Sequence, residues 1–123
     1  FFFFFTTDRQ GCVYRGIEGV SVSLEKALKG SIAGVRLLPP DTKDTSVDPY
    51  LLKIEPGSKL VNHFFSHKGE EMGYVLSGTL ALWVDGQRQE AGTGDFVYLT
   101  KQIPEQWENI GENVAEMLWL KIK

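Results

Sequence analysis

The segment PGSKLVNHFFSHKGEEMGYVLSG, residues 56–78, gathers two histidines and two glutamates in one short stretch of extended character. Its centre is His67, which is followed four residues later by Glu71, with Gly69 between them. Glycine tolerates backbone conformations that other residues resist, so the chain can bend there and bring imidazole and carboxylate together. Both groups are common ligands of divalent metals. The segment therefore predicts a polar site at the mouth of a β-hairpin.

Short apolar runs separated by turn residues surround this segment on both sides. Asp85-Gly86 divides two of them, and Asp-Gly is a strong hairpin signal because glycine supplies the positive φ angle that the turn requires. No convincing amphipathic helix appears. The pattern predicts an all-β fold, either a sandwich or a closed barrel. The expected strands cover residues 12–15, 20–24, 33–38, 50–54, 61–65, 71–76, 79–84, 87–91, 95–99, 105–109 and 114–122.

Length and composition indicate one ordinary globular domain. The chain has 123 residues, 42% of them hydrophobic, and a net charge of −3. We interpret the five phenylalanines 1–5 as artefact or unassigned residues and assign residues 6–123 to a single domain. No basic cluster suits nucleic acid, and no apolar stretch reaches the roughly 20 residues that span a membrane.

The single cysteine, Cys12, has no partner for an internal disulfide. No general base is evidently paired with it either, so we interpret it as an incidental thiol. Nothing in the sequence asks for an oxidising compartment, and we expect a cytoplasmic protein.

Strand alternation places Glu71, Gly73 and Val75 on one face. If that face points inward, Gly73 leaves space beside the carboxylate, and we expect a ligand-sized pocket there. The residues expected to rim the pocket are His67, Glu71, Glu105, Trp107 and Met117.

Two interpretations of this pocket stay open. In the first, it binds a divalent metal. In the second, Glu71 and Glu105 face each other and hold an amine, because two carboxylates in one pocket favour a cation. Aromatic walls for that amine would come from Trp107, Trp83 or Tyr74. Trp83 and Tyr74 equally suit packing of the core or an interface.

The order and spacing of these residues resemble the two cupin motifs over residues 50–121. The residues that resemble the first motif are Pro56, Gly57, His63, His67, Glu71 and Gly78. Those that resemble the second are Gly94, Asp95, Phe96, Val97, Tyr98, Pro104, Trp107 and Asn109. The resemblance implies a double-stranded β-helix, the cupin jelly-roll barrel.

The resemblance also implies a metal site, from which this sequence departs twice. The family's later histidine is replaced by Glu105, and His63 stands two residues from the position of the first. The ligand set carried over is His67, Glu71 and Glu105, with His63 reaching it through a bulge. Such a set would hold Mn²⁺, Fe²⁺, Zn²⁺ or Ni²⁺.

More narrowly, residues 66–86, 92–99 and 103–120 are similar to cupin domains that follow a helix-turn-helix in bacterial regulators. That similarity implies a sensor that binds a small-molecule effector and reaches DNA only through a helix-turn-helix domain absent from this sequence. It also implies a homodimer, in which we expect residues 20–24 and 33–38 to lie at the interface. The alternative function is a small metal-dependent cupin enzyme, of the dioxygenase or isomerase type.

Overall fold

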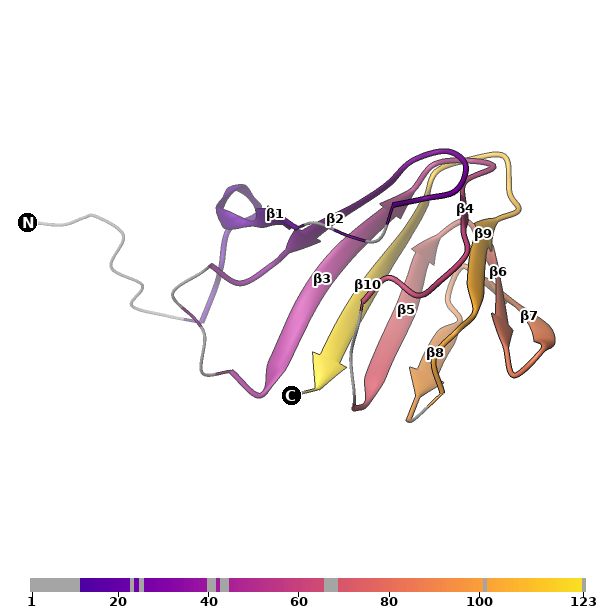
Figure 1. Ribbon diagram of the computed structural model, residues 1–123. Helices are drawn as coiled ribbons and strands as arrows, with labels where there is room; N and C mark the ends of the chain where they lie inside the picture. Colours follow the sequence, from indigo (N-terminus) through magenta and orange to yellow (C-terminus); the bar gives the residue numbers. More distant parts are fainter. Residues whose placement is uncertain are drawn as a thin grey trace, which may run out of the picture.

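The fold is a pair of antiparallel β-sheets that face each other (Figure 1). The computed structural model describes residues 12–22, 24, 26–39, 42, 45–65, 69–100 and 102–122. The larger sheet has six strands in the order β1-β2-β3-β10-β5-β8, and the smaller has four in the order β4-β9-β6-β7. The predicted all-β jelly roll is therefore confirmed.

The six-stranded sheet is built around β10, which lies between β3 and β5. Its strands are β1 (Val20–Val22), β2 (Ile32–Arg36), β3 (Val47–Ile54), β5 (Glu71–Ser77), β8 (Phe96–Leu99) and β10 (Ala115–Ile122). The four-stranded sheet consists of β4 (Lys59–Leu60), β6 (Thr79–Val84), β7 (Gln87–Gly92) and β9 (Gln106–Asn109). A short 3₁₀ turn, η1 (Gly16–Glu18), precedes β1. None of the described helices is long and apolar enough to cross a membrane.

The hairpin between β6 and β7 turns at Asp85-Gly86, as predicted. Both residues have positive φ, 52° at Asp85 and 77° at Gly86, which is the geometry of the tight turns that match the twist of paired strands. Two expected strands are absent. Residues 12–15 form no strand, and residues 61–65 form a bend in which His63 and Phe64 are both buried. The bend lets these two consecutive side chains both enter the interior between the sheets, where an extended strand would direct them to opposite faces.

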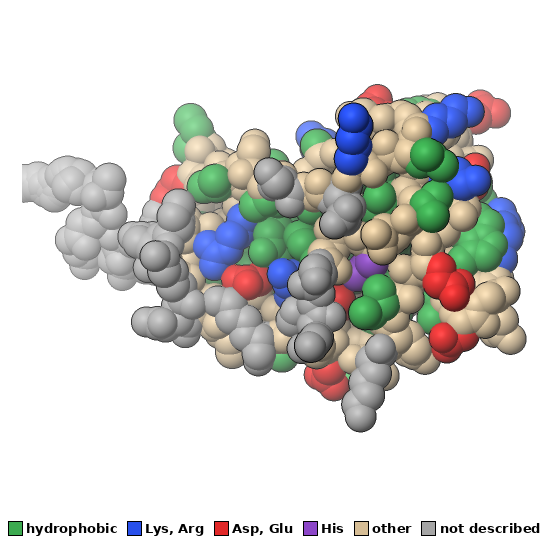
Figure 2. Space-filling view, in the orientation of Figure 1, with side chains coloured by type: hydrophobic (Ala, Val, Ile, Leu, Met, Phe, Trp, Pro, Cys, Tyr) green, Lys and Arg blue, Asp and Glu red, His purple; other side chains and the backbone are tan. Residues whose placement is uncertain are grey.

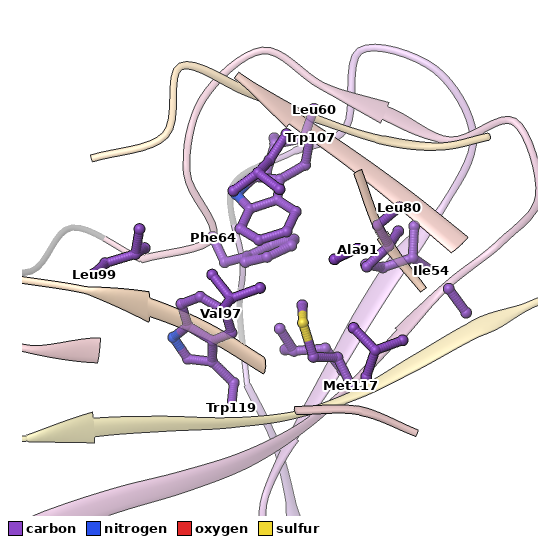
Figure 3. Packing of buried hydrophobic residues seen from close by; sticks show 14 of the residues in the cluster. Ile54, Leu60, Phe64, Leu80, Ala91, Val97, Leu99, Trp107, Met117 and Trp119 are labelled. Carbon is purple, nitrogen blue, oxygen red and sulfur yellow. The ribbon is translucent and has the colours of Figure 1, made fainter. Parts of the chain in front are cut away.

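The hydrophobic core fills the space between the sheets (Figure 3). Its largest fully buried side chains include Trp107, Trp119 and Phe64. The two indole rings meet edge to face, with centroids 5.7 Å apart, and Phe64 lies 4.6 Å from Trp107. Such arrangements are favourable for aromatic rings. The remaining core members are Tyr50, Leu52, Ile54, Leu60, Val75, Leu80, Leu82, Val84, Ala91, Val97, Leu99, Ala115 and Met117.

The outward side of the six-stranded sheet also carries apolar side chains, which we call the outer apolar face. Cross-strand register aligns them in two rows that run from β2 or β3 to β8. The first row is Val35, Leu51, Leu118, Tyr74 and Phe96. The second row is Pro49, Leu120, Met72 and Tyr98. Tyr74, Phe96 and Tyr98 are exposed.

Candidate functional site

A histidine and a glutamate meet inside the barrel. Glu71 opens β5 with its side chain directed inward, and His63 enters from the bend before it. Their exposed fractions are both 2%, and His63 Nε2 lies 3.0 Å from Glu71 Oε1. Polar groups buried this deeply need hydrogen-bond partners, because a lost partner costs their full desolvation. We call these two residues the buried His–Glu pair.

Two indole rings donate hydrogen bonds to the pair. Trp107 Nε1 donates to His63 Nδ1 over 3.1 Å, and Trp119 Nε1 donates to Glu71 Oε1 over 2.8 Å. An indole nitrogen can only donate, so Nδ1 of His63 must accept. The imidazole proton of the neutral ring is then on Nε2, which donates to Glu71. The two tryptophans thereby fix both the tautomer and the orientation of the pair.

Aromatic rings occupy the space around the pair. The imidazole centroid lies 5.5 Å from those of Phe64 and Trp119 and 6.1 Å from that of Trp107. Gly73 faces inward as predicted, but the expected pocket beside it is filled by Trp119. A Cβ built on Gly73 would lie 2.6 Å from Trp119 Cζ3 and 3.1 Å from Met117 Sδ. The glycine therefore makes room for an indole ring of the protein itself.

A row of charged side chains continues from the pair across the sheet. In the register of β3, β10 and β5, Asp48 pairs with Lys121, and Lys121 pairs with Glu71. Directly paired residues share a face, so all three belong to the inward side. Asp48 accepts a hydrogen bond from Arg36 over 3.0 Å. Figure 2 shows basic and acidic side chains side by side on this view, to the left of a histidine.

Tyr50 lies between the charged row and the core. It pairs with Arg36 on β2 and with Trp119 on β10. Burial raises the pKa of its hydroxyl, and the carboxylate of Asp48 raises it further. The phenol therefore stays neutral and can donate a hydrogen bond at physiological pH.

The predicted aromatic pocket residues divide between the two sides of the barrel. Trp107 and Met117 are buried inside, with exposed fractions of 1% and 0%. Tyr74 lies on the outer apolar face. Trp83 is only partly buried, and Arg88 stacks over its ring 5.6 Å from the centroid. Neither Tyr74 nor Trp83 faces the buried His–Glu pair, because each alternates with the inward side chains of its strand.

The structure changes the predicted set of ligands. Glu105 is exposed, and its Oε1 accepts a hydrogen bond from the backbone of Gly86 over 3.1 Å. It stabilises the β6–β7 turn and does not face Glu71. The amine site that the sequence suggested therefore lacks its second carboxylate. His63 does reach Glu71, because the bend at residues 61–65 takes up the two extra residues. His67 lies outside the described residues.

Sequence reasoning missed Trp119 and Lys121 as members of the site. The signal was present in the alternation of residues 115–121, which puts 115, 117, 119 and 121 on one face of a strand. Phe65 was missed as well. Its ring lies 4.6 Å from that of Tyr50, beside the charged row.

The described residues do not fit a metal in this arrangement. None of them form a group of three or more histidine, cysteine, aspartate or glutamate side chains arranged to hold an ion. In the fixed tautomer, Nδ1 of His63 accepts from Trp107 and Nε2 carries the proton, so neither nitrogen offers a lone pair. A metal-binding histidine usually donates one ring N–H and binds the ion through its other nitrogen, but in His63 that other nitrogen, Nδ1, already accepts from Trp107. We therefore derive no chemical step through a metal.

A cavity of about 410 Å³ lies where the edges of the two sheets approach each other. It opens between β7 and β8, and neither member of the buried His–Glu pair lines it. The lining residues are Leu82, Val84, Gln89, Glu90, Ala91, Asp95, Phe96, Val97, Tyr98, Leu99 and Gln102. Both of its carboxylates have partners within their own strand or turn: Glu90 pairs with Arg88, and Asp95 accepts from the backbone of Gly92.

Several solved structures share this fold. A predicted oxalate decarboxylase from Thermotoga maritima is 23% identical, with a TM-score of 0.69 over 90% of this chain and 98% of that one. A cupin 2 conserved barrel protein from Salinispora arenicola is 25% identical, with a TM-score of 0.62 over 76% of each chain. The cupin domain of an XRE-family transcriptional regulator from Enterobacter cloacae is 19% identical, with a TM-score of 0.61 over 72% of this chain and 93% of that one.

Sequence comparison supports the same relationship. No curated protein matches the sequence. The family model described as a cupin domain matches residues 50–121, from within β3 to the last but one residue of β10. The match includes both members of the buried His–Glu pair and both tryptophans that orient them. Because it covers more than half of the chain, this protein belongs to the cupin domain family.

Proposed function

We propose that this cupin domain binds a small-molecule effector inside its barrel, as the cytoplasmic sensor part of a bacterial transcriptional regulator. The observation that carries the proposal is a group of inward-facing side chains at one end of the barrel, where the partly buried Lys121 and Phe65 lie with Tyr50 beside the buried His–Glu pair. Small-molecule sites are concave and mostly apolar, with a few placed polar groups. The similarity to the cupin domain of an XRE-family regulator supports the regulatory role.

Oriented polar groups favour recognition over turnover here. A metal-dependent enzyme needs a firmly held ion with an open coordination position. The described residues supply one carboxylate and one imidazole whose lone pair is already used. The alternative of a dioxygenase or isomerase would depend on further ligands, such as His67, which lies outside the described residues.

A thermal-shift screen of metabolite-sized compounds tests the proposal. A ligand at 100 times its dissociation constant stabilises the folded state by about 2.7 kcal/mol, which raises the melting temperature by roughly 10 °C in a domain of this size. We expect His63→Gln to abolish the shift caused by a true effector, and Trp83→Phe, on the outer side, to leave it intact.

The screen separates this site from the other candidates. Compounds whose shift persists in His63→Gln bind elsewhere, for instance in the cavity between β7 and β8, and would contradict the proposal. Mn²⁺ and Zn²⁺ are included as separate probes. A large shift with either ion alone, lost in His63→Gln, would establish a metal centre. That result would favour the alternative function, a metal-dependent enzyme.

We also propose that two copies pair through the outer apolar face. Its exposed members Tyr74 and Phe96 are directly paired across β5 and β8, and Val35 brings β2 into the same row. Apolar patches of this kind on a sheet mark protein interfaces. The expected strand 20–24 contributes less, because Val22 is turned towards the core.

Charge placed on the outer apolar face is expected to dissociate this dimer. Phe96→Lys puts an ammonium within the interface, where burial without a partner is costly, and we expect at least a tenfold weaker association by analytical ultracentrifugation. Val61→Lys, an equally exposed position away from this face, is the control. A monomer in the unmodified protein, or equal effects of the two variants, would contradict the interface.

A further inference from the structure

A lysine faces the inside of the barrel beside the buried His–Glu pair. Lys121 is paired with Asp48 on one side and Glu71 on the other, in the inward row at one end of the six-stranded sheet. It is partly buried, unlike Lys53 on the same sheet, which is exposed on the outward side. A lysine in an inward position is uncommon, because its charge loses hydration there.

Aromatic rings hold the Lys121 ammonium in place. Its Nζ lies 4.6 Å from the centroid of Phe65 and 5.5 Å from that of Tyr50. A cation over an aromatic face is stabilised by the ring's quadrupole. The rings fix the position of the charge but offer no oxygen to its three N–H donors. No described residue accepts a hydrogen bond from this ammonium, which is held in place by the rings with its N–H groups able to donate.

The neighbouring charges are engaged with other groups. Arg36 donates to the carbonyl oxygens of Leu38, Pro39 and Thr42 and to Asp48, so it ties the β2–β3 loop and neutralises that carboxylate. Glu71 Oε1 accepts from His63 and Trp119. Lys121 is thus the group of this cluster best placed to donate to an incoming anion.

We propose that Lys121 anchors a carboxylate group of the small molecule bound in the barrel, whose apolar body packs against Phe65 and Tyr50. The class of ligand is a small carboxylic acid with an aromatic or aliphatic body. This inference rests on the proposed function, since it names the ligand class of the same site. A carboxylic acid therefore replaces the amine that the sequence suggested. An amine at this site would meet the ammonium of Lys121, because the carboxylate of Glu105 does not lie there.

Matched acids and amides test the charge requirement. The probes are benzoate, phenylacetate and hexanoate, each measured by calorimetry beside its primary amide and the amine of corresponding size. An acid and its primary amide have the same shape, so the difference between their affinities reports the contribution of the charge. We expect at least one acid to bind about 10-fold or more tightly than its amide, as a charge-assisted hydrogen bond supplies.

Variants of Lys121 assign the effect to this side chain. We expect Lys121→Gln to weaken the acid about 10-fold or more while leaving amide affinity unchanged, and Lys121→Arg to recover part of the loss. Lys53→Gln, on the outward side of β3, is the matched control and should change neither. A lysine that only caps the end of the strand would alter thermal stability without changing the acid-to-amide ratio.

The outcomes separate this inference from the proposed function. Equal binding of acids and amides, tighter binding of amines, or an unchanged acid affinity in Lys121→Gln would overturn the carboxylate anchor and leave a ligand-binding barrel. An effector without an acidic group from the thermal-shift screen would do the same. Absence of binding by every probe and every screened compound would overturn both.

Discussion

Replacing Glu71 with leucine is expected to lower the free energy of unfolding by about 3–5 kcal/mol, as breaking a buried polar pair does. The carboxylate accepts from His63 Nε2 and Trp119 Nε1, and leucine accepts from neither. Both donors would remain inside the barrel without the oxygen that they now share. Each unsatisfied buried donor costs about 1–3 kcal/mol, which is more than the stabilisation gained by burying the apolar leucine side chain. Chemical denaturation measures the change.

Glutamine at the same position provides the control. The amide oxygen of Glu71→Gln can accept both hydrogen bonds, although a neutral acceptor forms weaker ones. We expect at most half of the loss caused by leucine. Equal losses in the two variants would show that the negative charge matters more than the accepted hydrogen bonds. A leucine variant as stable as the unmodified protein would contradict the hydrogen bonding described for the site.

Adding one methyl group at Gly73 is expected to destabilise the protein by about 3 kcal/mol, at the upper end of ordinary overpacking. The new Cβ of Gly73→Ala would lie 2.6 Å from Trp119 Cζ3, closer than real Cβ contacts allow. Trp119 is fully buried and cannot move outward, so its ring must tilt. A tilt also weakens the bond from Trp119 to Glu71.

The matched control for this substitution is Gly16→Ala, because a Cβ at Gly16 would meet no atom within 4 Å. Thermal unfolding of the two variants compares the same chemical change in a packed and an open place. We expect a change within about 0.5 kcal/mol at Gly16, as for ordinary surface positions. A similar change at both glycines would mean that Trp119 has room to adjust.

The architecture could be predicted because its signals are local. The Asp85-Gly86 turn and the alternation around Glu71 depend on neighbours in sequence, and both are found as expected. The bend at residues 61–65 could not be predicted this way. His63 and Phe64 point inward in succession because the interior offers partners to both, and those partners come from β9 and β10.

The site was harder to predict because its members meet through cross-strand register. A shift of one residue turns every side chain of a strand to the opposite face. Glu105 and Trp107 were both expected at the rim of the pocket, yet Glu105 contacts the β6–β7 turn while Trp107 enters the core. Trp119 joins Glu71 through the pairing of β10 with β5, which no local pattern reveals.

The central place of β10 also governs how this chain reaches its native state. β10 joins β3 to β5, and its register couples Ile54 with Ala115 across most of the matched family domain. Contacts between residues so distant in sequence form only after a large loop has closed, and the entropy lost in closing the loop precedes any stabilisation by the contacts. Barrels rich in such pairings fold in milliseconds to seconds, more slowly than helical bundles of similar size. Until β10 docks, the edges of β3 and β5 expose unpaired backbone groups. Chains are therefore most prone to aggregate during folding, before β10 has paired.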